Sequence, residues 1–151
     1  MLRASDAPLA RCVRGGAVTS VPHAEVVPGD LAIVHEGDLI PADARVLAAT
    51  RDARMDKCEL TGEPEAERRS AECTDENPLE TENLVFAGCS LATGAVCVLV
   101  TATGLGTIMG TLLELFAFRA AVAAPPAWAR SVPARRLRRC ERALVDLDLA
   151  V

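Results

Sequence analysis

Short apolar runs alternate with turn residues over the first half of the chain. The apolar runs cover residues 25–27, 31–35, 39–40 and 45–47, and the turn sequences between them are Pro28-Gly29-Asp30, Glu36-Gly37-Asp38 and Pro41-Ala42-Asp43. Proline presets φ for a turn and glycine permits unusual backbone angles, so these sequences predict tight reversals between strands. Turns spaced by about eight to twelve residues are typical of a β-sandwich or roll.

The pattern changes at Thr50, because residues 50–83 are polar, rich in acids and without a regular period. This composition predicts exposed loops. A defined turn, Leu60-Thr61-Gly62-Glu63-Pro64, lies inside the segment. Loops on a rigid β-scaffold are where binding and catalytic residues concentrate, so we expect any chemistry to lie here.

An uncharged segment then runs from residue 84 to residue 113 and is long enough to span a bilayer. Glycines and threonines interrupt it at turn-like intervals, which favours short soluble elements instead. We interpret it as a buried strand, a turn region at 90–94, a second strand at 96–101 and then a helix. A membrane span is the alternative, because membrane helices tolerate glycine.

Helical spacing at the end of this segment predicts one amphipathic helix. Ile108, Leu112, Leu115 and Phe116 recur at that spacing, and Thr107 stands where it is able to cap the first turn. We expect the apolar face to pack into the core. The predicted fold is therefore mainly β, a distorted β-sandwich or jelly-roll-like domain closed by one C-terminal amphipathic helix.

Composition narrows the class of protein. The chain has 151 residues, 50% hydrophobic and 25% charged, which fits one globular domain and excludes a disordered or collagen-like chain. A net charge of -5 argues against general nucleic-acid binding. The six cysteines contain no C-x-x-C pair and neither histidine has zinc-like spacing, so we expect reduced thiols and no bound metal or other cofactor. The N-terminus lacks a secretory signal, which predicts a cytoplasmic domain.

Charge is unevenly distributed along the chain. Residues 1–118 carry 9 basic and 18 acidic groups, whereas residues 119–151 carry 7 and 3. The latter segment is rich in proline and arginine, and we predict a solvated helix or a disordered basic tail, with an address or anion-binding patch as the alternative. We therefore divide the chain into a flexible N-terminus at 1–10, a domain at 11–118 and an unassigned tail at 119–151.

Glu63 is the candidate catalytic residue, on a projecting turn. Gly62 before it lets the backbone approach another surface closely, and Thr61 is able to hold the turn through bonds to backbone groups. A carboxylate on such a tip can orient a water molecule for attack on a group bound elsewhere.

Five ordered motifs in this sequence resemble the actuator domain of P-type cation-transporting ATPases. They are Val27-Pro28-Gly29-Asp30, the run from Gly37 to Arg45, the run from Asp56 to Glu63, the run from Asn83 to Gly88, and Thr103-Gly104 with Thr107 and Gly110. The resemblance covers about residues 11–115, which corresponds to the cytoplasmic loop between the second and third membrane helices of such pumps. The run from Arg69 to Thr81 is most similar to sodium/potassium and proton/potassium pump α-subunits.

This resemblance implies a role in dephosphorylation. In the family, Mg-ATP phosphorylates an aspartate in a separate domain, and the glutamate of the T-G-E loop positions the water that hydrolyses the aspartyl phosphate. Carried over, that role falls on Glu63, with Thr61 and Gly62 shaping the loop. The implied partners are the phosphorylation domain and the transmembrane domain of a complete pump. The domain itself would be cytoplasmic and would be held at the membrane as part of that pump. The implied cofactor, Mg-ATP, belongs to that complete pump.

The sequence departs from the family pattern in three places. Pro64 stands where serine follows the glutamate in the sodium/potassium subgroup, although heavy-metal pumps often carry T-G-E-P. The chain has no D-K-T-G-T motif and no nucleotide-binding domain, so we expect no ATP-driven transport from this polypeptide alone. The tail at 119–151 does not lead into a membrane helix, which indicates a truncated or spliced product or a gene-model artefact. The alternative function is a stand-alone, non-catalytic binding module that docks on a partner protein.

Overall fold

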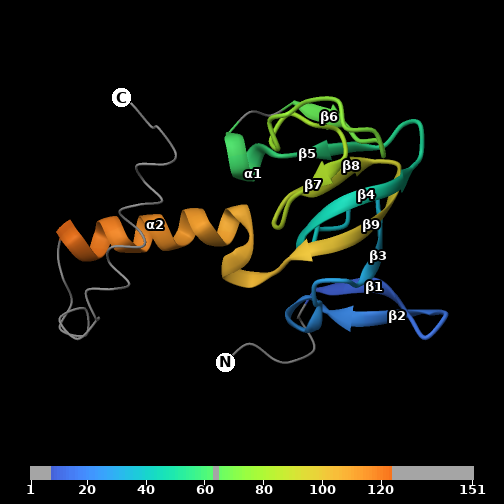
Figure 1. Cartoon of the computed structure of the whole chain (residues 1–151), viewed down its shortest axis with the longest axis horizontal. Coiled ribbons are helices and arrows are strands. Elements are labelled where there is room, and N and C mark those ends of the chain that lie inside the picture. The colour runs from blue at the N-terminus through green and yellow to red at the C-terminus, as the bar shows by residue number, and fades with distance from the viewer. Residues whose placement is uncertain (1–7, 63–64, 124–151) are drawn as a thin grey trace. The chain divides into compact units, whose positions relative to one another are not determined.

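Two antiparallel β-sheets provide most of the regular secondary structure in the described chain (Figure 1). The structure is a computed structural model that describes residues 8–62 and 65–123. The chain divides into two units, Met1–Gly110 and Thr111–Val151, and both sheets lie in the first.

The larger sheet has six strands in the order β2-β1-β3-β9-β4-β7. Its strands are β1 (Leu9–Arg14), β2 (Ala17–Pro22), β3 (Leu31–His35), β4 (Asp43–Ala49), β7 (Leu84–Val85) and β9 (Ala95–Ala102). The smaller sheet has the order β6-β5-β8, with β5 (Arg54–Asp56), β6 (Ala66–Arg68) and β8 (Ser90–Thr93). The helical elements are η2 (His23–Glu25), α1 (Cys58–Thr61), η3 (Gly104–Gly106) and α2 (Ile108–Ala123).

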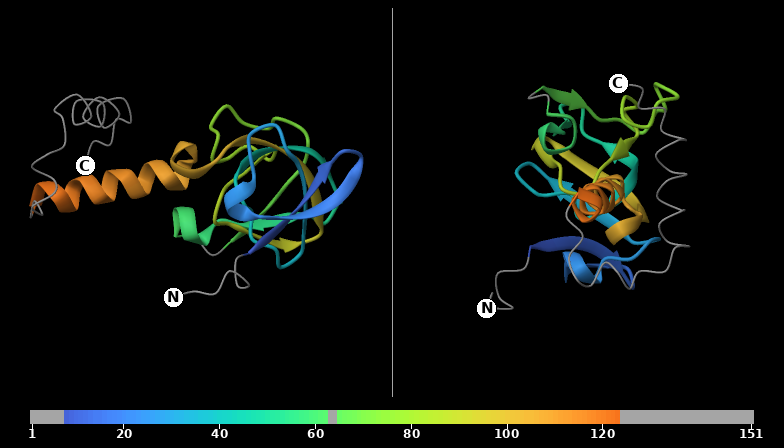
Figure 2. Two further views of the ribbon diagram at one scale, coloured as in Figure 1. Left: turned by 90° about the horizontal axis from the view of Figure 1, so that it is seen from below. Right: turned by 90° about the vertical axis from the view of Figure 1, so that its left-hand side faces the viewer.

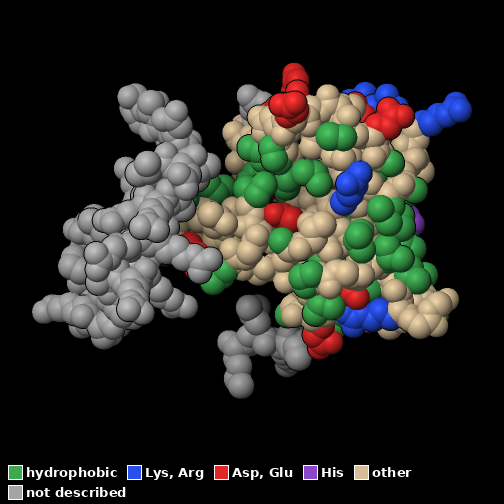
Figure 3. Space-filling model, viewed as in Figure 1, with side chains coloured by type: hydrophobic (Ala, Val, Ile, Leu, Met, Phe, Trp, Pro, Cys, Tyr) green, Lys and Arg blue, Asp and Glu red, His purple; other side chains and the backbone are tan. Residues whose placement is uncertain are grey.

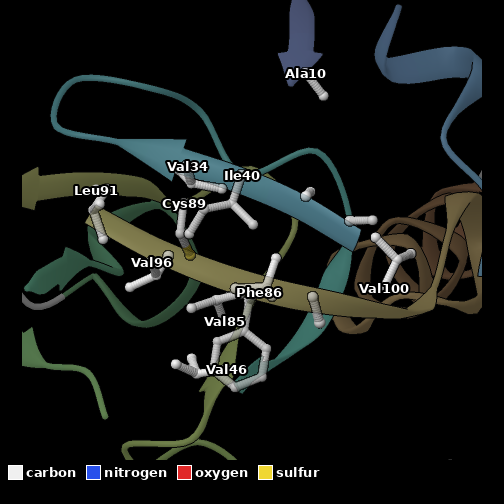
Figure 4. Packing of buried hydrophobic residues seen from close by; sticks show 14 of the residues in the cluster. Ala10, Val34, Ile40, Val46, Val85, Phe86, Cys89, Leu91, Val96 and Val100 are labelled. Carbon is white, nitrogen blue, oxygen red and sulfur yellow. The ribbon is translucent and has the colours of Figure 1, made fainter. Parts of the chain in front are cut away.

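Buried aliphatic side chains from both sheets form one core. Alternate residues of β9, Val96, Val98 and Val100, are at most 2% exposed, as the two-residue period of a strand requires. Leu91 of β8 belongs to the same cluster (Figure 4), and so does Met55 of β5. Strands of both sheets curve around this shared interior (Figure 2), so the predicted β-rich sandwich-like domain is confirmed.

The first hairpin was not among the predicted strands. Arg14 of β1 pairs with Ala17 of β2 across a two-residue turn, and Gly15 and Gly16 have φ angles of 59° and 80°. Two consecutive positive φ angles define a type I′ turn, whose twist suits a hairpin and for which Gly-Gly is a favoured sequence. The Gly-Gly pair was therefore an available signal for this hairpin.

Four of the predicted strands are present and two short runs behave differently. Strands occupy the predicted runs at 31–35, 45–47 and 96–101, and the buried strand expected from residue 84 is present as β7. In the run 25–27, Glu25 instead ends the 3-10 turn η2 and Val26 caps it, and residues 39–40 form only an isolated bridge from Leu39 to Ser90. The expected turn region at 90–94 is mostly strand β8, since its residues pair with β5 and only Gly94, at φ 78°, makes the turn.

The polar segment 50–83 is exposed over most of its described residues, as predicted, but it is only partly loop. It contributes β5, α1 and β6, and Met55 of β5 is fully buried. Its charged residues Lys57 and Arg69 are also buried, at 2% and 1% exposure. Composition was misleading because these charges are paired inside the domain instead of being solvated.

Helix α2 begins as predicted. The Thr107 hydroxyl accepts a hydrogen bond from the Gly110 N–H at 3.0 Å, which is the geometry of an N-cap. Of the positions expected to be buried, Leu112 and Leu115 are partly exposed and Phe116 is 66% exposed, so the helix buries less apolar surface than expected. Among the helices that the structure describes, none is both long and apolar enough to cross a membrane.

Candidate functional site

The loop predicted to carry chemistry follows a single turn of helix, α1. Thr61 is the last residue of α1, and Gly62 caps it in the left-handed conformation with φ 78° and ψ 0°. The Gly62 N–H donates to the Cys58 carbonyl at 2.8 Å. This conformation is easily adopted only by glycine, so the sequence ends the helix here and redirects the chain. Glu63, the predicted catalytic residue, lies outside the described residues, as does Pro64.

Helix α1 is held at its start by Asp56 and Lys57. The Asp56 carboxylate accepts a hydrogen bond from the Cys58 N–H at 2.8 Å. The Lys57 carbonyl accepts three hydrogen bonds, from the N–H groups of Leu60 and Thr61 and from the Thr61 hydroxyl. Thr61 is thus bonded to Lys57, just before the helix, whereas the Gly62 N–H is bonded to Cys58, the first residue of the helix.

The Lys57 side chain points into the domain and is only 2% exposed. Its Nζ donates to the Leu79 carbonyl at 2.8 Å and lies 2.6 Å from Oε1 of Glu67. A second carboxylate, that of Glu80, is 3.7 Å away. An ammonium group taken out of water is stabilised only when its hydrogen bonds and its charge are both matched, and these contacts match them.

Glu67 joins Lys57 to a second buried cation. Its Oε2 lies 2.6 Å from an Nη atom of Arg69, while Oε1 contacts Lys57. The Arg69 guanidinium also donates to the carbonyls of Thr81 and Leu84, at 2.7 and 3.3 Å. We call Lys57, Glu67 and Arg69 the charge cluster. It connects the start of α1, strand β6 and the segment leading into β7.

Burial affects the titration of the groups around this cluster. Desolvation lowers the pKa of the Arg69 guanidinium, although the adjacent Glu67 carboxylate opposes that change. Burial raises the pKa of the nearby Cys89 thiol to about 11, against the opposing charge of Arg69. Cys89 is therefore a protonated, unreactive thiol. The five cysteines that the structure describes are all free of disulfide bonds.

Two aspartates of the predicted turns, Asp30 and Asp38, lie on either side of β3 and bond to arginines of the neighbouring strand β1. Asp30 accepts hydrogen bonds from Arg14 and from the Val27 N–H, and Asp38 accepts from Arg11 and from the His35 N–H. The hydrogen bond from Arg14 is the main cause that lowers the pKa of Asp30. Burial raises the pKa of Asp38, but the hydrogen bonds from the His35 N–H and from Arg11 outweigh it, so this pKa is also lowered.

Asp43, in the third predicted turn, has a different function in the fold, because it connects β4 to two distant segments. One carboxylate oxygen accepts from the Ala87 N–H and the other from the Ile108 N–H, both at 2.8 Å. The second contact places a carboxylate at the first residue of α2, where it complements the helix dipole.

Sequence reasoning found Thr61, Gly62 and Glu63 but gave no role to Lys57, Glu67 or Arg69. The missed signal is a pattern of opposite charges. Glu67 and Arg69 are two residues apart, and Met55, two residues before Lys57, pairs directly with Glu67 across β5 and β6. Predicting β5 and β6 as a pair of strands would have indicated that Lys57 and Glu67 lie close together. Within the described ranges, no group of three or more His, Cys, Asp or Glu side chains is placed to hold a metal ion.

Comparison with known proteins identifies relatives for most of the chain. A family model described as the P-type ATPase actuator domain matches residues 4–117. Over 103 residues, or 68% of this chain, it is 42% identical to sodium/potassium-transporting ATPase subunit alpha-4 of Rattus norvegicus and 41% identical to subunit alpha-3 of Homo sapiens. Those 103 residues are 10% of each relative, so the chain spans about a tenth of their length.

Two solved structures of a zinc-transporting PIB-type ATPase, in different states, share the fold. One of them has a TM-score of 0.56 at 26% sequence identity, covering 71% of this chain and 16% of that one. The other has a TM-score of 0.60 at 24% identity, covering 87% of this chain and 18% of that one. The likeness in fold therefore extends to pumps of a second transport class.

Proposed function

From the premise that this chain belongs to the P-type ATPase actuator-domain family, we propose that it performs the dephosphorylation step of a cation-transporting pump. The single observation that best supports this is the geometry at Gly62. A left-handed cap ends α1 directly before Glu63, on a turn tied to Lys57. A glutamate that directly follows such a cap in the sequence is suited to act on a group of another domain.

In the proposed mechanism, Glu63 acts on water. Its carboxylate accepts a hydrogen bond from a water molecule and orients the water's oxygen towards the phosphorus of an aspartyl phosphate on the phosphorylation domain. As the water oxygen bonds to phosphorus, the P–O bond to the aspartate breaks and releases the aspartate carboxylate and inorganic phosphate, while the Glu63 carboxylate accepts the proton from the water. Thr61 and Gly62 hold the turn from which Glu63 extends. Hydrolysis then requires the loop to dock, so domain movement gates it.

The partners follow from the same proposal. A dephosphorylating loop needs the phosphorylation domain that carries the aspartate and the transmembrane domain that carries the ion. Mg-ATP would serve the complete pump, with no binding to this chain. The domain would lie on the cytoplasmic side of a membrane that it does not itself cross, and it would not bind nucleic acid. We propose the boundaries 11–118 for the functional unit, with 1–10 and 119–151 outside it.

A replacement experiment tests this function. Residues 11–118 would replace the matching segment of the rat alpha-4 subunit, and ATP hydrolysis and phosphoenzyme turnover would be measured in membranes. We expect the substituted pump to be phosphorylated from ATP and to turn over. A pump that is phosphorylated normally but dephosphorylates no faster than one lacking the loop glutamate would contradict the proposal, and would favour the non-catalytic docking module.

The distribution of charge on the face shown in Figure 3 gives little support to the alternative of a non-catalytic module that docks through an acidic surface. In Figure 3, basic, acidic and apolar side chains are intermixed over the described part of that face. A partner attracted by an acidic face would need the acids to gather. The replacement experiment therefore takes precedence over a search for a partner.

A further inference from the structure

We propose that Lys57 is a positioning residue for the reactive loop: its buried ammonium group fixes the carbonyl that holds Thr61, the residue directly before the Gly62 cap. This inference rests on the proposed function only for its effect on hydrolysis. The structural part concerns this chain alone, and the two parts are tested by different measurements.

Helix α1 lacks the means to hold itself in place. It has four residues, far fewer than the 12 to 15 or so that make even a favourable isolated helix marginal. None of its four side chains is buried, and only Leu60 packs partly against the core. The position of the turn must therefore be set by neighbouring residues.

Lys57 provides that anchor because both of its ends are engaged. Its carbonyl accepts from the Leu60 N–H at 2.8 Å, the Thr61 N–H at 2.9 Å and the Thr61 hydroxyl at 3.3 Å. Its ammonium group contacts the Leu79 carbonyl and the Glu67 carboxylate at 2.8 and 2.6 Å. A shift of the Lys57 backbone would stretch these short charged contacts, so the acceptor for the turn is fixed by the domain interior.

The other end of the anchor is itself fixed. Glu67 lies on β6 and is shared with Arg69, whose guanidinium bonds two carbonyls and whose backbone N–H donates to the Ala53 carbonyl at 2.9 Å. Leu79, the remaining partner of Lys57, follows Asn77, whose side chain accepts from the Leu79 N–H at 3.1 Å. The charge cluster therefore supports the turn from several separate segments.

Amide hydrogen exchange in the full 151-residue chain tests the positioning role. The variant Lys57→Met keeps the apolar stem and removes the ammonium group, whereas Lys57→Arg retains a buried cation. We expect the Thr61 and Gly62 amides to exchange about tenfold faster in Lys57→Met, with partial restoration in Lys57→Arg. The control is the Gly29 amide, which donates to the Val100 carbonyl at 2.8 Å in a region remote in sequence.

Two results would overturn the inference. Unchanged exchange at Thr61 and Gly62 would show that the ammonium group does not hold the turn. Equal acceleration at Gly62 and Gly29 would show that Lys57 contributes only global stability. If Lys57→Met fails to fold, Glu67→Gln supplies the same comparison, because it removes the counter-charge and keeps the shape of the side chain.

The functional consequence is measured in the substituted pump. We expect Lys57→Met to slow phosphoenzyme decay several-fold without changing the ATP concentration that gives half-maximal phosphorylation, with recovery in Lys57→Arg. A normal decay rate in Lys57→Met, in a pump where Glu63→Gln does slow decay, would overturn the inference and leave the proposed function intact. A normal rate in Glu63→Gln would instead overturn the proposed function, while the exchange measurement would still decide the positioning role.

Discussion

The six-stranded sheet and the segment around α1 are stabilised in different ways. In the sheet, the buried side chains of β4 and β9 are aliphatic, and neighbouring strands are joined by regular backbone pairing. In the segment from β5 to β7, the buried residues include Lys57, Arg69 and Thr81, which bond to backbone carbonyls or to nearby polar side chains. The sheet relies on apolar burial, whereas the segment around α1 adds buried ion pairs and hydrogen bonds.

This difference matters for a loop that must be placed accurately. Apolar burial is strong but non-directional, so it fixes a scaffold more readily than the orientation of one turn. Charged hydrogen bonds are directional, and each fails when its partner moves. The charge cluster thus supplies orientation at Lys57, where the short helix α1 buries none of its own side chains.

The largest expected loss of stability comes from the apolar region. Ile40 is 1% exposed in the core, and Ile40→Ala leaves a cavity there. We expect a loss of about 3 to 4 kcal/mol in the free energy of unfolding, measured by urea titration. Ile40→Val is the matched control, with an expected loss of about 1 kcal/mol. A loss below about 1 kcal/mol for Ile40→Ala would mean that this core is not the scaffold's main support.

The charge cluster is expected to matter almost as much. Glu67→Ala would leave Lys57 and Arg69 as buried cations without their shared carboxylate. Breaking a buried ion pair by removing one partner costs about 3 to 5 kcal/mol, and we expect the lower end because Glu67 is 32% exposed. Urea titration of Glu67→Ala beside Glu67→Gln, which should lose less, measures it. Equal, small losses in both would show that the segment does not depend on the charge.

A smaller effect is expected where a single carboxylate joins the sheet to α2. Asp43→Ala removes the acceptor for the Ala87 and Ile108 N–H groups, so we expect a loss of about 2 kcal/mol. Asp43→Asn keeps one acceptor oxygen and should lose about half as much. Thermal unfolding measures both variants. If Asp43→Asn proved as unstable as Asp43→Ala, the negative charge near α2, and not the pair of bonds, would be the important contribution.

The next prediction concerns Gly62, which caps α1 in the segment from β5 to β7. Gly62→Ala forces an alanine into the left-handed conformation, at a cost of about 1 kcal/mol. Gly106→Ala is the control, because Gly106 has an ordinary φ and an added Cβ meets no atom within 4 Å. Thermal unfolding should show a lower midpoint for Gly62→Ala alone. Equal midpoints for the two variants would mean that the turn relaxes freely.

The smallest effect concerns pH. Bonding to Arg14 depresses the pKa of Asp30 below its ordinary value of 3.8, so ionised Asp30 stabilises the fold above that pH. The contribution is lost as pH falls through the depressed value. Asp30→Asn should therefore be less stable than wild type at neutral pH, with the gap closing in acid. Urea titrations at several pH values measure the gap, and a gap that widens in acid would reverse the assignment.

Sequence reasoning succeeded where the structure depends on periodic apolar residues. The run 31–35 and the valines of 96–101 predict strands because alternate residues must face a core. The hairpin at Gly15-Gly16 and the strand β8 were missed. Both lie in short segments where pairing with a neighbouring strand, and not an apolar period, fixes the conformation.

The site was only partly predictable for a related reason. Thr61 and Gly62 were found through a motif, and their hydrogen bonds agree with the predicted turn. Lys57 and Arg69 lie in the polar segment that was predicted to be exposed, because the sequence shows each charged residue but not the residue that pairs with it. The ion pair of Lys57 depends on the pairing of β5 with β6, which brings Glu67 beside Lys57 and which only the fold reveals.

Phosphoenzyme lifetime in the substituted pump tests the central claim most directly. Glu63→Gln keeps the size of the loop side chain and removes its capacity to take a proton, while Glu65→Gln makes the same change at an exposed acid two residues further along. We expect the phosphoenzyme to persist at least about a hundredfold longer in Glu63→Gln and to decay normally in Glu65→Gln. Equal lifetimes in the two variants would contradict the account.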